Sequence, residues 1–350
     1  MHKHGGDIYR NQGVVDYSAN INFRGMPESV RQAAKDAIDA SVCYPDPQCE
    51  ELKAAIAEKE NVPAEWIFCG NGAADVIFSL VLALKPQKAL LPIPSFYEYR
   101  QALESVGCQI SEILLKEDEA FCLQKRFVNE IPMDTDMVCL CNPNNPTGNT
   151  IPEQILTEIL QFCASKKIRV VADECFLRFH PHYEKMSCKR FLKQYPNLLI
   201  VNAFTKFYAM AGLRLGYLMT GDLSLLHAVA QQLPEWNVSS IAQRAGISAL
   251  QDTEYEKRTR QLIEKERRYL IQEFLKMGCT VFPSEADYIT FRLPQEKTGF
   301  LLKERLLEGK ILIRSCANYR NMPPDCYRIA VKQHADNEEL VRQVWRILIQ

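Results

Sequence analysis

Lys206 stands in a short polar and aromatic segment between two apolar runs, Leu198–Ala203 and Leu215–Met219, that predict buried strands. A lysine caught between buried strands is costly to leave unpaired. Its amine could form a Schiff base with a carbonyl compound, and Arg214, eight residues further on, could hold a phosphate group of that compound. The segment taken alone also fits an ordinary surface lysine in a turn. The rest of the chain must decide between these two interpretations.

A glycine turn opens the predicted helix Val76–Leu84 in a way that suits a phosphate. Gly70-Asn71-Gly72 follows the predicted strand Trp66–Cys69, and the first N–H groups and positive dipole end of the helix attract anions. The spacing also suggests a dinucleotide fingerprint, but Asp75 stands where the third glycine belongs and no acidic residue ends the next strand. We therefore expect no nicotinamide site, while a plain strand-turn-helix without a ligand stays open.

Two further polar motifs follow predicted strands. Asn145 lies just after the strand Met137–Cys141, and Asp173 lies just after the strand Ile168–Ala172. Strands alternating with helices predict an α/β fold with a mostly parallel central sheet and helices on both faces. Ligands bind at the carboxyl ends of such strands, so we expect these residues, the glycine turn and Lys206 to share one site. Asp173 alone could simply cap a helix.

The composition excludes several classes of protein. The chain has 350 residues, 47% of them hydrophobic, and a net charge of −1, so nothing predicts binding to nucleic acid or to a membrane surface. The longest apolar run is too short to span a bilayer, and no apolar signal segment opens the sequence. The 13 cysteines show no zinc pattern, and His2 and His4 lack further ligands. We expect a cytoplasmic protein with reduced cysteines and no metal.

Together the motifs resemble the fold-type-I pyridoxal-phosphate (PLP) enzymes of the class I/II aminotransferase group. The resemblance covers essentially the whole chain and rests on Gly70-Asn71-Gly72, Asn142–Gly148, Asp173-Glu174, and Thr205-Lys206 with Arg214. Within that group the chain is similar to the threonine-phosphate decarboxylases of cobalamin synthesis, and next to the histidinol-phosphate aminotransferases. The segments that carry this closer similarity are His4–Gly6, Ser18–Asn22, Tyr44–Asp46, Lys206–Tyr217 and Ile311–Tyr319.

The resemblance implies how the cofactor, pyridoxal 5′-phosphate, is held. Lys206 would form the Schiff base, and Asp173 would face the pyridine nitrogen and keep it protonated, so that the positive ring draws in electrons. The remaining contacts would come from Asn145 at the ring hydroxyl, Phe96 stacked on the ring, and Gly72, Ala73, Thr205 and Arg214 around the phosphate. Tyr44 would reach the phosphate of a neighbouring subunit, which implies a homodimer with shared active sites. Phe96 could also be ordinary core.

For the substrate, the resemblance implies a phosphorylated amino acid. Arg328 would take its carboxylate, although this arginine could also pair with a surface carboxylate. Its phosphate would be held by Arg314, with His4, Gly5 and Asn20 or Asn22 nearby, and Asn145 would also contact the substrate. The implied reaction is decarboxylation of L-threonine O-3-phosphate to (R)-1-amino-2-propanol O-2-phosphate. Transamination of histidinol phosphate with 2-oxoglutarate stays open, as does a PLP-binding regulator without turnover.

Two positions depart from the wider group. Phe176 stands where a tyrosine often donates to the ring hydroxyl, and this departure is shared by the threonine-phosphate decarboxylases. Ala203 replaces a serine that usually binds the cofactor phosphate, and Thr205 can replace it only in part. The first departure favours the decarboxylases, while the second predicts weaker cofactor binding rather than different chemistry.

The pattern of elements changes after Pro234. A long charged helix is predicted at Glu254–Met277, and the strands and helices beyond it do not alternate strictly. We expect an N-terminal arm and helix at 1–35 that pack with the small domain, a large PLP-binding domain at 36–235, and a small α+β domain at 236–350. The arm is rich in glycine and asparagine, which suits a segment that meets a ligand but fits a flexible tail equally well.

Overall fold

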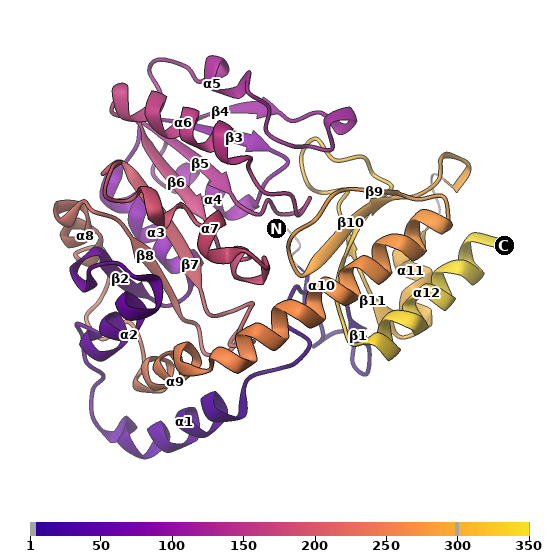
Figure 1. The fold of residues 1–350 in the computed structure, drawn as a ribbon, viewed down its shortest axis with the longest axis horizontal. Coiled ribbons are helices and arrows are strands. Elements are labelled where there is room, and N and C mark those ends of the chain that lie inside the picture. Colours follow the sequence, from indigo (N-terminus) through magenta and orange to yellow (C-terminus); the bar gives the residue numbers. More distant parts are fainter. Residues whose placement is uncertain (1–4, 298–300, 350) are drawn as a thin grey trace.

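A seven-stranded sheet forms the centre of the computed structural model, which describes residues 5–297 and 301–349. The strand order is β2-β8-β7-β6-β5-β3-β4, and helices cover both faces (Figure 1). In this sheet β8 runs opposite to the other six strands, which all point the same way. The predicted α/β fold is confirmed. The strands are β2 (Ile67–Gly70), β3 (Lys88–Ile93), β4 (Gln109–Leu114), β5 (Met137–Cys141), β6 (Arg169–Asp173), β7 (Leu198–Ala203) and β8 (Gly216–Met219).

Two hydrophobic cores lie on opposite faces of this sheet. Along β5, Val138 and Leu140 belong to one core, while Met137, Cys139 and Cys141 belong to the other. This alternation follows from the two-residue period of a strand, and it explains why the run is apolar throughout. The first core includes α6 (Glu153–Ser165), and the second includes α3 (Ala73–Leu84), α4 (Tyr97–Ser105) and α8 (Leu223–Ala230). The sheet is therefore rigid where its strands end.

Three helices pack together beside the sheet: α1 (Glu28–Asp39), α2 (Glu50–Glu60) and α9 (Ser240–Gln251). From α9 the chain enters α10 (Thr253–Lys276), which runs to the C-terminal part of the molecule (Figure 1). The helix predicted at Lys189–Gln194 is instead a 3-10 helix, η5 (Cys188–Phe191). Its segment is confined between the capping Ser187 and a proline at position 196, which leaves little room for a regular helix.

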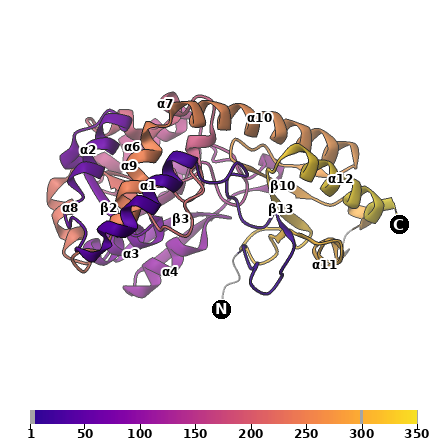
Figure 2. The ribbon, with the colours of Figure 1, turned by 90° about the horizontal axis from the view of Figure 1, so that it is seen from below.

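The C-terminal part contains a four-stranded antiparallel sheet, with α11 (Leu302–Glu308) and α12 (His334–Ile349). The N-terminal arm joins this part, because β1 (Val15–Asp16) pairs in parallel with β11 (Ile311–Leu312). Figure 2 shows the arm beside β10 and β13. The proposed division at residues 35 and 235 stays a prediction. The four strands are β12 (Arg314–Ser315), β13 (Cys326–Ala330), β10 (Tyr288–Arg292) and β9 (Thr280–Val281).

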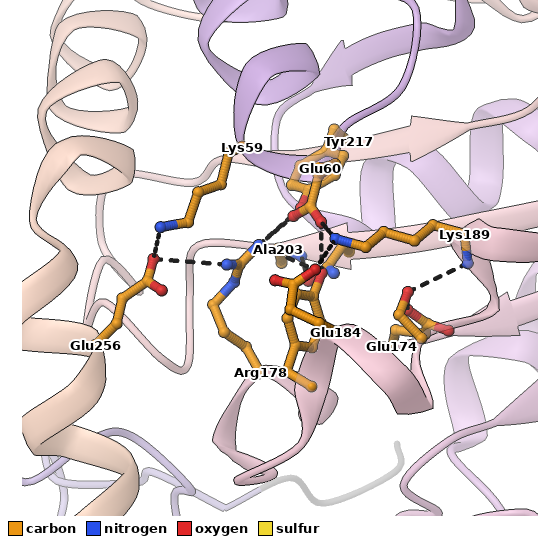
Figure 3. Close-up of polar contacts among 12 residues, drawn as sticks. Lys59, Glu60, Glu174, Arg178, Glu184, Lys189, Ala203, Tyr217 and Glu256 are labelled. Atoms are coloured by element: carbon orange, nitrogen blue, oxygen red, sulfur yellow. Dashed lines mark hydrogen bonds and ion pairs between the residues drawn. The ribbon is translucent and has the colours of Figure 1, made fainter.

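A buried network of charged side chains surrounds Glu60 (Figure 3). Glu60 at the end of α2 accepts hydrogen bonds from Tyr217 Oη at 2.7 Å and Lys189 Nζ at 2.9 Å, and it also pairs with Arg178. Arg178 lies 3.6 Å from Glu256 of α10. Because each charge faces an opposite charge, the network joins α2, β8 and α10 without an unpaired carboxylate.

Within residues 5–297 and 301–349, no helix combines the length and apolar character needed to cross a membrane. The same described residues contain no group of three or more His, Cys, Asp or Glu side chains arranged to hold a metal ion.

Candidate active site

One cavity at the carboxyl ends of β5, β6 and β7 brings most of the predicted site residues together. Its empty volume is about 980 Å³, including the part open to solvent. The strands place their polar residues at one edge because β5, β6 and β7 are parallel. The predicted residues that line the cavity are Gly5, Asn20, Ala73, Phe96, Asn145, Asp173, Thr205, Lys206, Arg214, Arg314 and Arg328.

Lys206 is half-buried and lies three residues beyond the end of β7. Its backbone carbonyl accepts a hydrogen bond from the N–H of Asn22 at 3.1 Å, and its Nζ lies 5.7 Å from the ring centroid of Phe176. Burial lowers the pKa of Lys206, Asp287 acts in the opposite direction, and Arg328 lowers the pKa further. A lowered pKa leaves more of the amine in its neutral, nucleophilic form.

Asp173 is the last residue of β6, and its buried carboxylate is held by two donors. Tyr99 Oη donates to Oδ2 at 2.6 Å, and the N–H of Cys175 donates to Oδ1 at 3.0 Å. Burial first, and then the Asp173 charge, raise the pKa of the Tyr99 phenol well above its usual value, so the phenol stays a donor. The sequence analysis missed Tyr99. Its position three residues after Phe96, in the first turn of α4, could have indicated that both side chains share one face.

The turn between β2 and α3 forms a cradle for an anion. Gly72 precedes α3 with a φ of +96°, and a Cβ added there would lie 2.6 Å from Nη2 of Arg214. The backbone of Gly72 and the guanidinium of Arg214 are therefore so close that no side chain fits between them. Ala73, Ala74 and Thr205 complete this side of the cavity. N–H groups at a helix start, together with a guanidinium, suit a phosphate.

Two further arginines, Arg314 and Arg328, also line the cavity. Arg314 and Arg328 are direct cross-strand partners in β12 and β13, and both are buried. Arg328 donates to the side-chain oxygen of Asn145 and, at 3.1 Å, to the carbonyl of Ser18. Among the described residues, neither arginine forms an ion pair with a carboxylate. The alternative in which Arg328 pairs with a surface carboxylate therefore finds no support in this geometry.

Tyr319 contacts both Asn145 and Arg314 at the same part of the cavity. Tyr319 Oη donates to the side-chain oxygen of Asn145 at 3.1 Å, and its ring lies 5.4 Å from the Arg314 guanidinium carbon. Arg314 also donates to the side-chain oxygen of Asn318 at 2.8 Å. Two buried polar atoms here, Oδ1 of Asn20 and Nε of Arg328, have no hydrogen-bond partner among the described residues. They leave a donor and an acceptor for a polar ligand.

Among the described residues, three predicted residues do not line the cavity: Gly72, which lies against Arg214 at its edge, Asn22 and Tyr44. Asn22 does not line it, because its amide donates to the Phe207 carbonyl at 2.7 Å and to Tyr255 Oη at 2.8 Å. This corrects its expected role: Asn22 holds the segment after Lys206 and does not face a substrate. Tyr44 is 80% exposed and stacks on Trp236, with 4.5 Å between ring centroids. His4 lies outside the described residues.

Comparison with known proteins agrees with this geometry. Residues 12–344 match the model of the family described as aminotransferase class I and II. The chain belongs to this family. Its cofactor is therefore pyridoxal 5′-phosphate, as predicted.

Individual relatives within the class I/II family have two different activities. The chain is 37% identical to a threonine-phosphate decarboxylase from Salmonella typhimurium, over 96% of this chain and 91% of that protein. It is 30% identical to a histidinol-phosphate aminotransferase 2 from Carboxydothermus hydrogenoformans, over 98% and 94%. A solved histidinol-phosphate aminotransferase from Clostridium acetobutylicum superimposes with a TM-score of 0.89 at 30% identity, over 95% and 98%.

The cavity of this class I/II family member fits PLP. The cradle at Gly72, which a side chain would fill, suits the cofactor phosphate, and the amine of Lys206 suits its aldehyde carbon. Asp173 also lines the cavity, and its carboxylate, held by two donors, suits a pyridinium nitrogen. Phe96 lines the cavity and suits stacking on the ring. Phe176 and Ala203, the two departures from the wider group, also line the cavity.

Proposed function

We propose that this chain decarboxylates L-threonine O-3-phosphate to (R)-1-amino-2-propanol O-2-phosphate, as a step of cobalamin biosynthesis. The observation that carries the proposal is the cross-strand pair of buried arginines, Arg314 and Arg328. Like charges directly opposite each other destabilise a sheet unless an anion compensates them. A substrate with both a carboxylate and a phosphate supplies two anionic groups, whereas histidinol phosphate supplies one.

Each residue of the cavity has a defined task in this reaction. Bound PLP supplies an electron sink for the electron pair left when the carboxylate departs. Arg328 binds and orients that carboxylate, because Asn145 and the Ser18 carbonyl prevent its guanidinium from turning. Lys206, once its amine is released by the substrate amine, carries at Nζ the proton that replaces the lost carboxylate on Cα.

The angle of the carboxylate distinguishes decarboxylation from transamination. The bond that stands perpendicular to the cofactor ring is the one that breaks, so a decarboxylase must hold the carboxylate out of the ring plane. Carbon dioxide release and keto-acid formation should be measured with threonine phosphate and with histidinol phosphate plus 2-oxoglutarate. We expect carbon dioxide from the first substrate. Keto acid as the sole product would contradict the proposal.

One other function has specific support, and a third stays open. Transamination of histidinol phosphate is favoured by the high structural similarity to the Clostridium acetobutylicum enzyme, and keto acid would identify it. A PLP-binding regulator without turnover would show cofactor absorbance and no product from either substrate. The Lys206→Ala variant tests the common site: we expect it to lose both the cofactor–lysine absorbance and the activity. Activity retained in that variant would contradict the role of Lys206.

The Arg314→Ala variant tests the phosphate site. Removing a buried cation that binds the substrate phosphate should raise KM by roughly 30-fold or more while cofactor content stays the same. Arg320→Ala is the matched control, because Arg320 lies in the connection that follows β12 but is exposed and pairs with Glu112. Loss of cofactor in Arg314→Ala would mean that this arginine serves the cofactor phosphate instead.

We also propose a cytoplasmic homodimer in which Tyr44 reaches the partner's site. The support is the exposed apolar face that contains Ile38, Val42, Tyr44 and Trp236. Mixed dimers of Lys206→Ala and Tyr44→Ala subunits test the sharing of sites, because half of the sites in each mixed dimer would then be intact. Activity regained on mixing is expected. An inactive mixture, or a monomer in sedimentation, would contradict the proposal.

A further inference from the structure

Asp287 is a buried carboxylate for which the reaction above has no task. It is 1% exposed, and neither carboxylate oxygen accepts a hydrogen bond from another described residue. Its backbone cannot turn the side chain toward solvent: its carbonyl accepts from the N–H of Val331 at 2.7 Å, and the preceding carbonyl of Ala286 accepts from Arg267 at 2.8 Å. A fixed, buried carboxylate without donors is costly, and such groups are typical of functional sites.

The segment Ser284–Tyr288 packs on the loop that carries Asn145, next to the candidate site. The N–H of Glu285 donates to the Gly148 carbonyl at 2.8 Å, and Tyr288 Oη donates to the Asn144 carbonyl at 2.7 Å. The Tyr288 ring contacts the ring of Phe176 edge-on, at 5.1 Å between centroids. Phe176 in turn lies beside the Lys206 amine. The residue next to Asp287 is thus connected with Lys206 through Phe176.

The charges around Asp287 and Lys206 indicate that these two side chains attract each other electrostatically. Burial raises the pKa of Asp287 to about 6, against the opposing charges of Lys206, Lys332 and Arg328, in decreasing order of effect. Arg267 also interacts with Asp287. Among the ionisable groups that change the pKa of Lys206, Asp287 has the largest effect, followed by Arg328, Cys175 and Glu98. None of these cations is within ion-pair distance of Asp287 in the described part of the chain.

We propose that Asp287 is a positioning residue for Lys206: its negative charge holds the released lysine ammonium beside the cavity and keeps a proton on Nζ for the substrate Cα. This rests on the proposed function, in which Lys206 delivers that proton. The Cα–carboxylate bond breaks, carbon dioxide leaves, and the electron pair on Cα takes the proton from Nζ. Each turnover then draws one proton from solvent to restore the ammonium. Asp287 acts through its charge and exchanges no atoms.

The Asp287→Asn variant of the holoenzyme tests this proposal, because asparagine keeps the shape and removes the charge. The pH at which the absorbance of the cofactor–lysine bond changes should fall by about one unit, since a nearby anion no longer stabilises the protonated form. We also expect kcat to fall about tenfold with KM nearly unchanged. Glu285→Gln is the matched control. Its carboxylate lies two residues away but contacts Thr150 and His180, so the absorbance titration should not move.

An absorbance titration of Asp287→Asn that matches the native enzyme would overturn the proposal. Removal of an unpaired buried charge should leave the variant at least as stable in thermal unfolding, and a clearly lower Tm would assign Asp287 a structural role instead. The absorbance readout does not depend on which product forms. If native enzyme releases no carbon dioxide yet the titration shifts, the decarboxylase proposal fails while the electrostatic link stands.

Discussion

Asp173 is held by donors from two separate parts of the chain, one on each carboxylate oxygen. The phenol of Tyr99 comes from α4, and the N–H of Cys175 comes from the turn after β6. A carboxylate fixed before the cofactor binds needs no reorganisation when it meets the pyridine nitrogen. The same principle applies to Arg328, which Asn145 and Ser18 hold in place. At this scale the site depends on the partners of its residues as much as on the residues themselves.

Tyr99→Phe should weaken PLP binding by about tenfold or more, because a hydrogen bond to a charged group is lost while the ring still fills its buried position. The dissociation constant can be measured by titrating the cofactor-free protein with PLP and following absorbance. Tyr195→Phe, which removes a phenol bonded to Gln194, is the control and should bind PLP normally. Equal affinities in the two variants would show that Tyr99 does not position Asp173.

At the scale of elements, the turn from β2 into α3 is the most constrained connection. Gly72 needs its positive φ, and Gly216 at the start of β8 packs so closely that an added Cβ would lie 2.7 Å from the N–H nitrogen of Ala73. Glycine is therefore required by close approach as well as by conformation. Asp75 stabilises the same turn by accepting from the N–H of Asn71 at 2.8 Å. This contact explains why an aspartate, and not the glycine of a dinucleotide-binding motif, occupies position 75.

Gly72→Ala should lose stability and cofactor affinity together. The added Cβ meets the Arg214 guanidinium at 2.6 Å, so we expect PLP affinity to fall by about tenfold or more, and the positive φ should cost roughly 1 kcal/mol of stability. Gly107→Ala is the matched control, with a φ of +72° and no atom within 4 Å. It should lose stability only. Normal PLP affinity in Gly72→Ala would contradict the proposed phosphate cradle.

At the scale of the whole molecule, the charge network around Glu60 joins parts of the chain that are far apart in sequence. Burial by itself would raise the pKa of Glu60, but Arg178 and Lys189 lower it to about 2. A carboxyl group whose folded pKa lies below its unfolded value stabilises the fold above the unfolded pKa. That contribution disappears as the pH falls through the folded pKa. The network therefore predicts acid sensitivity between pH 4.5 and 2.

Glu60→Gln should make stability less dependent on pH in that range. Native protein should lose about 2 kcal/mol more unfolding free energy between pH 5 and pH 3 than the variant does. The variant should be less stable at pH 7, because Arg178 is left buried and unpaired. Urea unfolding at each pH measures both effects. Glu184→Gln, which removes an exposed partner of the same Lys189, should keep the native pH dependence; identical slopes in all three proteins would contradict the role of Glu60.

Much of the fold could be predicted because its signals are local. The strands Met137–Cys141 and Leu198–Ala203 have the expected bounds, since apolar runs mark them. The segment Lys189–Gln194 does not form the predicted α-helix, because so short a stretch gains few helical hydrogen bonds for the residues it orders. Asn22 was assigned to the substrate because its type suits a ligand, and only long-range contacts show that it faces Tyr255.

The order of motifs along the sequence was enough to predict the family, the cofactor and the edge of the sheet at which the candidate cavity lies, because strand ends and glycine turns are encoded by neighbouring residues. Tertiary structure alone decided which side chains support those motifs. Tyr319 contacts Asn145 from a segment far from it in sequence, and Asp287 acts on Lys206 from another. No local pattern reports such contacts, since burial and charge pairing depend on how the whole chain packs.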